Sequence, residues 1–229
     1  MIVAIVNQHG NADRSIVARN LAVLRARSGR RVCLATTGLW HGGNLWCEAR
    51  SAARIRPWVD VRSLGTRMVG EKLTAMRRQF NDIVVDAGAR DTEECRGALA
   101  AARCILVPVR AGEIDLVGQY TLVKRLNAAR ALNPEACILF VRVGSAEGPG
   151  AQEQASVLAH VCRVPGASLA STVLHDPAAH DYGAGRCVCD AETCDPEIAA
   201  DLHALYREVY AQAPARAAGT QRLRHAALG

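Results

Sequence analysis

The sequence has 229 residues, half of them hydrophobic, and its 28 lysines and arginines against 22 acidic residues give a formal net charge of +6. A chain of this length and apolar content buries a sizeable core, which excludes a small scaffold held together by disulfides. No apolar run reaches the roughly 18 residues that a membrane-spanning helix needs, and no export signal precedes the first strand, so we expect a cytoplasmic protein.

Apolar runs and stretches with helical periodicity alternate along the chain. The apolar runs predict strands at residues 2–6, 31–35, 82–85, 104–109, 137–143 and 169–174. Helical periodicity predicts helices at residues 15–28, 65–80, 91–102, 114–131, 151–162 and 196–211. This alternation predicts one α/β domain over residues 1–212, with a doubly wound, mostly parallel sheet covered by helices on both faces.

Two segments lack this pattern. Residues 38–57 are rich in Gly, Arg and Trp without clear periodicity, so we expect loop and short helix there. Residues 213–229 form a basic stretch after the last predicted helix, which is typical of a flexible tail.

The segment after the first strand lies where a phosphate-binding loop would lie, because ligands of parallel sheets bind at the carboxyl ends of the strands. A loop of the G-x-x-x-x-G-K-[ST] type needs small residues that let backbone N–H groups surround phosphate oxygens, and a lysine that reaches the β- and γ-phosphates. Here Asp13 stands in place of the second glycine, Arg14 in place of the lysine, and Ser15 is kept.

The first strand and its loop, with Ser15 and the run Asn20-Leu21-Ala22, resemble the start of the ParA/MinD family of deviant Walker A ATPases. Residues 81–92 (NDIVVDAGARDT) resemble the Walker B strand and switch region of plasmid-type ParA proteins, and Asp86, Arg90 and Asp91 match that switch region. The similarity covers roughly residues 1–210. It implies a P-loop NTPase-like fold and a role in plasmid or cargo partition, or in positioning a large complex.

The resemblance also identifies a candidate nucleotide site whose chemistry has changed. Its residues are His9, Gly10, Asn11, Asp13, Arg14, Ser15 and Asp86, of which Ser15 and Asp86 are the magnesium ligands if a magnesium nucleotide binds. His9 stands at the family's signature lysine. A carboxylate such as that of Asp13, about 4 Å from a phosphate charge, costs roughly 4 kcal/mol at an effective dielectric constant of 20.

Arg14 keeps the positive charge of the family's catalytic lysine but replaces a compact ammonium with a planar guanidinium. We expect it to pair with Asp13 or Asp86 and close the cavity. Thr36-Thr37-Gly38-Leu39 replaces the family's aspartate-x-aspartate-proline run, and Val141 stands at the asparagine that reads the adenine ring.

These departures predict a ParA-like pseudo-ATPase: a binding or regulatory protein without a nucleotide cofactor. Its partner would be a second copy of the chain, an active ParA-like relative, or another component of a partition or positioning complex. One alternative is a weak ATPase that binds ATP and magnesium at the altered loop, and another is that a different anion occupies the helix N-terminus. A third is a protein that coats non-specific DNA through its arginines, among them Arg54, Arg56, Arg62, Arg67, Arg77 and Arg78.

The nine cysteines are expected as free thiols. Cys33, Cys104 and Cys137 lie in apolar runs, where cysteine behaves as a small hydrophobe. Cys187, Cys189 and Cys194, with His175 and His180 upstream, have the residue types of zinc ligands. The single residue between the first two cysteines is shorter than the usual zinc spacing, which favours a thiol cluster without metal.

Overall fold

The structure of the protein is a computed structural model that describes residues 1–8, 12–37, 42–65, 67–110, 116–144, 151–176, 185–190 and 195–211. His9, Gly10, Asn11, His180 and Cys194 lie outside these residues, as does the predicted basic tail. No helix in the described part of the chain is long and apolar enough to cross a membrane.

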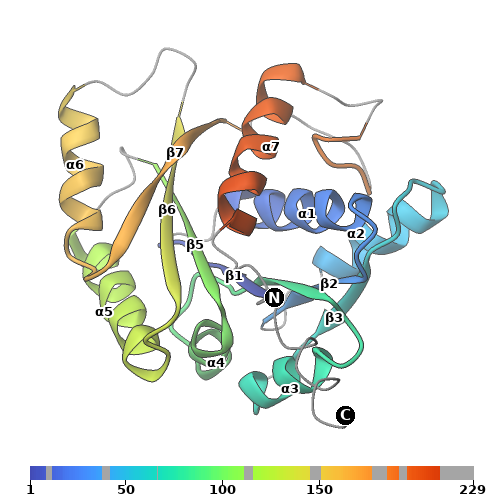
Figure 1. Ribbon diagram of the computed structural model, residues 1–229, viewed down its shortest axis with the longest axis horizontal. Helices are drawn as coiled ribbons and strands as arrows, with labels where there is room; N and C mark the ends of the chain where they lie inside the picture. Colours follow the sequence, from blue (N-terminus) through green and yellow to red (C-terminus); the bar gives the residue numbers. More distant parts are fainter. Residues whose placement is uncertain are drawn as a thin grey trace, which may run out of the picture.

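Strands and helices alternate over the described residues, as the sequence predicts (Figure 1). The strands are β1 (Ile2–Ile5), β2 (Val32–Thr36), β3 (Asp60–Ser63), β4 (Asp82–Asp86), β5 (Cys104–Val109), β6 (Cys137–Gly144) and β7 (Ala167–His175). The helices are α1 (Ala12–Arg27), α2 (Gly42–Ala52), α3 (Val69–Met76), α4 (Glu93–Ala101), α5 (Leu116–Leu132), α6 (Ala151–Val161) and α7 (Pro196–Ala211).

The strands form a single sheet in the order β3-β2-β4-β1-β5-β6-β7 across the described residues, and every pairing in it is parallel. The central strand β1 lies between β4 and β5. The chain moves from β1 to one half of the sheet and later crosses to the other half at β5, so the end of β1 lies where ligands of doubly wound sheets bind. The predicted α/β fold class is confirmed, and the sheet is fully parallel rather than mostly parallel.

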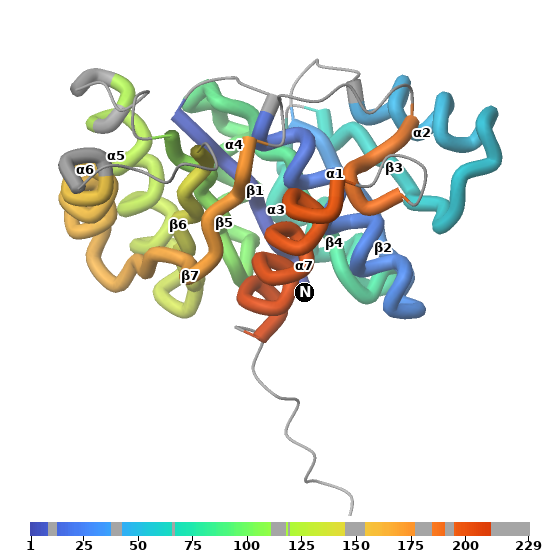
Figure 2. Tube along the Cα trace, turned by 90° about the horizontal axis from the view of Figure 1, so that it is seen from above, coloured from blue at the N-terminus to red at the C-terminus, as the bar shows by residue number. Residues whose placement is uncertain are grey.

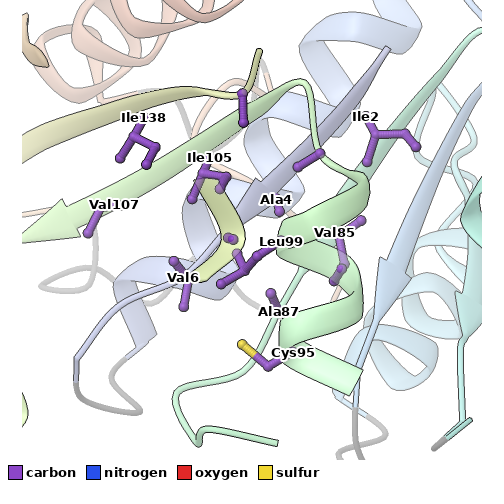
Figure 3. Close-up of a cluster of buried hydrophobic side chains, with 14 of the residues drawn as sticks. Ile2, Ala4, Val6, Val85, Ala87, Cys95, Leu99, Ile105, Val107 and Ile138 are labelled. Atoms are coloured by element: carbon purple, nitrogen blue, oxygen red, sulfur yellow. The ribbon is translucent and has the colours of Figure 1, made fainter. Parts of the chain in front are cut away.

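Each face of the sheet packs against its own set of helices because successive side chains of a strand point to opposite faces. Along β1, Ala4 contributes to the core under α3, α4, α5 and α6, whereas Val3 and Ile5 contribute to the core under α1, α2 and α7. Figure 3 shows Leu99 of α4 beside Ala4, and Cys95 of the same helix beside Ala87, in the first of these cores. In Figures 1 and 2, α1 and α7 lie side by side over the other face.

The sequence prediction missed β3 and misplaced some helix ends. Strand β3 is an edge strand with exposed and half-buried residues (Asp-Val-Arg-Ser), so it has no apolar run that would reveal it. The segment predicted as loop and short helix contains the eleven-residue helix α2. Helix α3 is shorter than predicted, and α1 begins at Ala12 instead of Ser15.

Candidate functional site

The early start of α1 changes the position of the candidate loop residues. Asp13, Arg14 and Ser15 belong to the first turn of this helix and lie beside the carboxyl end of β1. A carboxylate in a first turn is stabilised by the N-terminal end of the helix dipole, so Asp13 is a residue with which a helix can begin. These side chains therefore have fixed helical positions. The sequence prediction instead placed Asp13 and Arg14 in a loop before the helix.

Arg14 and Ser15 both bind the carboxylate of Asp86, at the end of β4. Arg14 forms an ion pair with Asp86 through Nε and donates a hydrogen bond from Nη1 to Oδ1 of Asn7 at 3.2 Å. The hydroxyl of Ser15 donates to Oδ2 of Asp86 at 2.6 Å. Of the two partners predicted for Arg14, the structure selects Asp86, and both oxygens of that carboxylate are engaged.

Asp13 pairs with an arginine that the sequence analysis did not single out. Its side chain is 2% exposed and receives two hydrogen bonds from Arg110, from Nε at 2.6 Å and from Nη2 at 2.8 Å. Arg110 follows β5 and also pairs with Asp176 at the end of β7. Hydrogen bonding to Asp13 outweighs burial and raises the pKa of Arg110.

This pairing corrects the electrostatic argument made from the sequence. The penalty of roughly 4 kcal/mol assumed a carboxylate that faces a phosphate without a counter-charge. In the structure, the guanidinium of Arg110 neutralises Asp13 and covers both of its oxygens. Around Asp13 and Asp86 the structure therefore has a set of ion pairs that ties α1 to the ends of β4, β5 and β7, rather than a lone negative charge.

A buried arginine of α5 lies against the carboxyl end of β1. Arg125 of α5 is 3% exposed; its Nη2 donates to the carbonyl oxygen of Asn7 at 3.3 Å and its Nη1 lies 3.6 Å from the sulfur of Cys95. No carboxylate of the described residues forms an ion pair with it, and its Nε has no hydrogen-bond partner. Arg14 and Arg125 thus contact Asn7 from two different helices.

The segment 185–190 is fastened to α1 and α2 by a buried ion-pair network. Arg50 of α2, 1% exposed, donates to the two oxygens of Asp190 at 2.7 and 3.0 Å, and Arg27 of α1 binds the same carboxylate at 3.0 Å. Oδ1 of Asn20 accepts from the backbone of Cys189 at 3.3 Å. Burial is the largest single influence on Asp190 and opposes its ionisation, but the hydrogen bonds from Arg50 and Cys187 and the charge of Arg50 together outweigh burial and lower the pKa of this carboxyl group.

Of the candidate zinc residues, the structure describes Cys187, Cys189 and His175. Cys187 and Cys189 are buried, and burial raises the pKa of the Cys187 thiol to about 12. Nδ1 of His175 lies 2.6 Å from the carboxylate of Asp201. Within the described residues, no group of three His, Cys, Asp or Glu side chains is placed to hold a metal ion.

The other positions named by the resemblance have different surroundings. Thr36 and Thr37 are buried at the end of β2, and the backbone N–H of Thr37 donates to the carbonyl oxygen of Asp86 at 3.2 Å. Val141 is fully buried in the core, opposite Pro108 in the sheet. Because its side chain packs inside the fold, Val141 does not line the candidate site. The six arginines proposed to meet DNA are all exposed.

Comparison with known proteins shows which solved structures share this fold. No protein-family model matches the sequence, and no curated protein does. The structure is similar to the MinD cell division protein of Aquifex aeolicus, with 11% identity and a TM-score of 0.66 over 92% of this chain and 96% of the other. It is also similar to the cell division ATPase MinD of Pyrococcus furiosus, with 16% identity and a TM-score of 0.63 over 93% and 99% of the chains. A plasmid partition protein of Borrelia burgdorferi aligns with 11% identity and a TM-score of 0.55 over 91% and 96%. The ParA/MinD-type fold expected from the sequence is therefore confirmed.

Proposed function

We propose that this chain is a ParA/MinD-type partition or positioning protein that acts by binding a protein partner and does not hydrolyse ATP. The observation that carries the proposal is the closed set of contacts around Asp86, in which Arg14 takes one carboxylate oxygen and Ser15 the other. The names of the similar structures, a cell division protein and a plasmid partition protein, support the cellular role.

The residues present do not fit a magnesium nucleotide. Magnesium prefers oxygen ligands with near-ideal octahedral geometry, and the two oxygen-bearing side chains kept from the family pattern are Ser15 and Asp86. Here the hydroxyl of Ser15 donates a hydrogen bond to Asp86, and Asp86 is ion-paired with Arg14. A metal ion would have to displace a guanidinium whose side chain is only 12% exposed.

The lysine that binds phosphate in the family pattern is also missing. Arg14 occupies its sequence position, but its Nε and Nη1 are turned toward Asp86 and Asn7. To contact a phosphate, Arg14 would have to leave the carboxylate of Asp86 without this counter-charge, which costs several kcal/mol for buried pairs. The positive charge retained in the sequence is therefore used inside the protein.

An activity measurement with matched variants tests this proposal. Purified protein incubated with ATP and magnesium should release no phosphate above the rate without protein. Asp13→Gly combined with Arg14→Lys restores the family's residue types, whereas Arg103→Lys changes an arginine that is paired with Glu135 at the opposite end of β5 from Arg110. ATP turnover by the unmodified chain that Arg103→Lys keeps and the double variant alters would overturn the proposal.

One observation favours the alternative of a weak ATPase. The hydroxyl of Ser15 and the carboxylate of Asp86 lie 2.6 Å apart, so the two residues expected to serve magnesium are still neighbours. Under this alternative, Arg14 would swing away when the nucleotide enters. The same phosphate-release assay decides between the two functions.

DNA binding is a further alternative that the exposed arginines around β3 and α3 support. Such binding depends on the release of counterions, so the affinity for duplex DNA would fall steeply with salt concentration. An affinity that is absent at low salt, or that does not change with salt, removes this alternative.

A further inference from the structure

Two cysteines begin neighbouring strands and face each other across them. Cys104 is the first residue of β5, Cys137 is the first residue of β6, and the two are direct partners in the parallel register. Adjacent strands are about 4.8 Å apart, which falls within the roughly 4.4–6.8 Å between Cα atoms that a disulfide spans. The backbone N–H of Cys137 donates to the carbonyl of Arg103 at 3.0 Å, which fixes this register at the strand start.

The two thiols differ in access to solvent. Cys104 is fully buried in the core under α1, α2 and α7, whereas Cys137 is half-buried at the rim of the same core. The positive charges of the Arg103 and Arg130 guanidinium groups both act to lower the pKa of the Cys137 thiol. Glu135 pairs with Arg103 at 2.9 Å and is itself largely exposed.

These surroundings make Cys137 the more reactive thiol. The hydrogen bond from Cys104 outweighs burial and, with the two arginines, lowers the pKa of Cys137 to about 7, while that of Cys104 is raised. A thiolate is the nucleophilic form of cysteine, and attack is fastest when the thiol pKa is near the ambient pH. By contrast, burial raises the pKa of Cys33 to about 12.

We propose that Cys137 and Cys104 form a peroxide-reactive dithiol, in which Cys137 attacks the peroxide and Cys104 resolves the product to a disulfide. The pair begins β5 and β6, whereas Arg110 and the rest of the candidate site lie at the carboxyl edge of the sheet. This inference is thus independent of the proposed binding function.

The reaction balances with a hydroperoxide as the oxidant. The Cys137 thiolate attacks one peroxide oxygen, the O–O bond breaks, and the departing oxygen takes a proton to become an alcohol, or water when the oxidant is hydrogen peroxide. The Cys137 sulfur is then a sulfenic acid. The Cys104 thiol attacks this sulfur, the S–S bond forms, and hydroxide leaves with the thiol proton as water. Two electrons pass from the two sulfurs to the peroxide.

Peptide mapping of the full chain tests the proposal without a mutation. Trypsin cleavage after arginine places Cys104 in the peptide 104–110 and Cys137 in the peptide 131–142, each with a single cysteine. Reduced protein is treated with less than one equivalent of hydrogen peroxide, the remaining thiols are alkylated, and the peptides are weighed. We expect the two peptides to be joined with the loss of two hydrogen atoms. The exposed Cys162 serves as the internal control: its thiol should survive the peroxide and be found alkylated.

Variants separate the two roles. In Cys104→Ala, the sulfenic acid on Cys137 should persist long enough to be trapped by dimedone, whereas in Cys137→Ala the peptide 104–110 should stay reduced. Cys162→Ala should leave the disulfide yield unchanged. In Arg130→Gln, the pH at which alkylation of Cys137 is half-maximal should shift upward.

Three results would overturn the proposal. The first is oxidation of Cys162 before Cys137 in the unmodified chain. The second is Cys137 oxidised without any link to the peptide 104–110. The third is an alkylation profile of Cys137 that matches that of Cys162 over the same pH range.

Discussion

The pair between Arg110 and Asp13 gives a quantitative prediction about the candidate site. Arg110→Ala removes both hydrogen bonds to a carboxylate that is 2% exposed. Loss of one partner of a buried ion pair destabilises a protein by about 3–5 kcal/mol, because the remaining charge stays buried. Arg110 itself is 22% exposed, so water can reach part of the gap and we expect about 3 kcal/mol.

Thermal and urea unfolding monitored by circular dichroism measure this effect. For a chain of this size, about 3 kcal/mol corresponds to a melting temperature roughly 6–12 °C lower. Arg96→Ala is the matched control because Arg96 also binds an aspartate through two hydrogen bonds, each of 2.8 Å, but is 61% exposed. Exposed pairs contribute little to stability, so this control should melt with the unmodified protein.

A double variant tests whether the unpaired charge of Asp13 causes the loss of stability in Arg110→Ala. Asp13→Asn combined with Arg110→Ala removes both charges, so it should recover much of the stability that Arg110→Ala loses. The reasoning is refuted if Arg110→Ala melts together with Arg96→Ala. It is also refuted if the double variant is less stable than Arg110→Ala.

Two other predictions concern a glycine and a histidine. A Cβ atom at Gly185 (φ +75°) would lie 2.2 Å from the backbone nitrogen of Arg50, whereas one at Gly29 (φ +78°) meets nothing within 4 Å. Denaturant titration should therefore show Gly185→Ala less stable than Gly29→Ala by about 1–3 kcal/mol, the cost of overpacking, and equal losses would contradict this. Burial lowers the pKa of His160, whose two ring nitrogens have no hydrogen-bond partner. The unfolded chain then binds the extra proton, so unfolding free energy should fall as the pH drops below about 6.5, and His160→Leu should flatten that dependence. A variant that keeps the same pH dependence would show that His160 is not its source.

The fold could be predicted because its inner strands are buried on both faces. Strands such as β1, β4 and β5 then appear in the sequence as short continuous apolar runs, and the helices between them keep their periodicity. Strand β3 was not predicted because it pairs along only one edge and its residues are largely exposed. Predictions that rest on apolar runs fail for such edge strands.

The contacts of the candidate site could not be predicted from the residue types. The family resemblance grouped Asp13, Arg14, Ser15 and Asp86, and the structure brings Arg14 and Ser15 onto the carboxylate of Asp86. Arg110 was not identified from the sequence; it is 97 residues from Asp13 and binds it because β5 lies next to β1. Which arginine reaches a buried carboxylate depends on strand order, and the residue types alone do not reveal that order.

A calorimetric titration of the unmodified chain with ATP and magnesium at millimolar concentration tests the central claim most directly. If the ion pair between Arg14 and Asp86 and the hydrogen bond from Ser15 hold the site closed, the titration should give no binding heat beyond that of dilution. Saturable binding with a micromolar Kd would contradict the account.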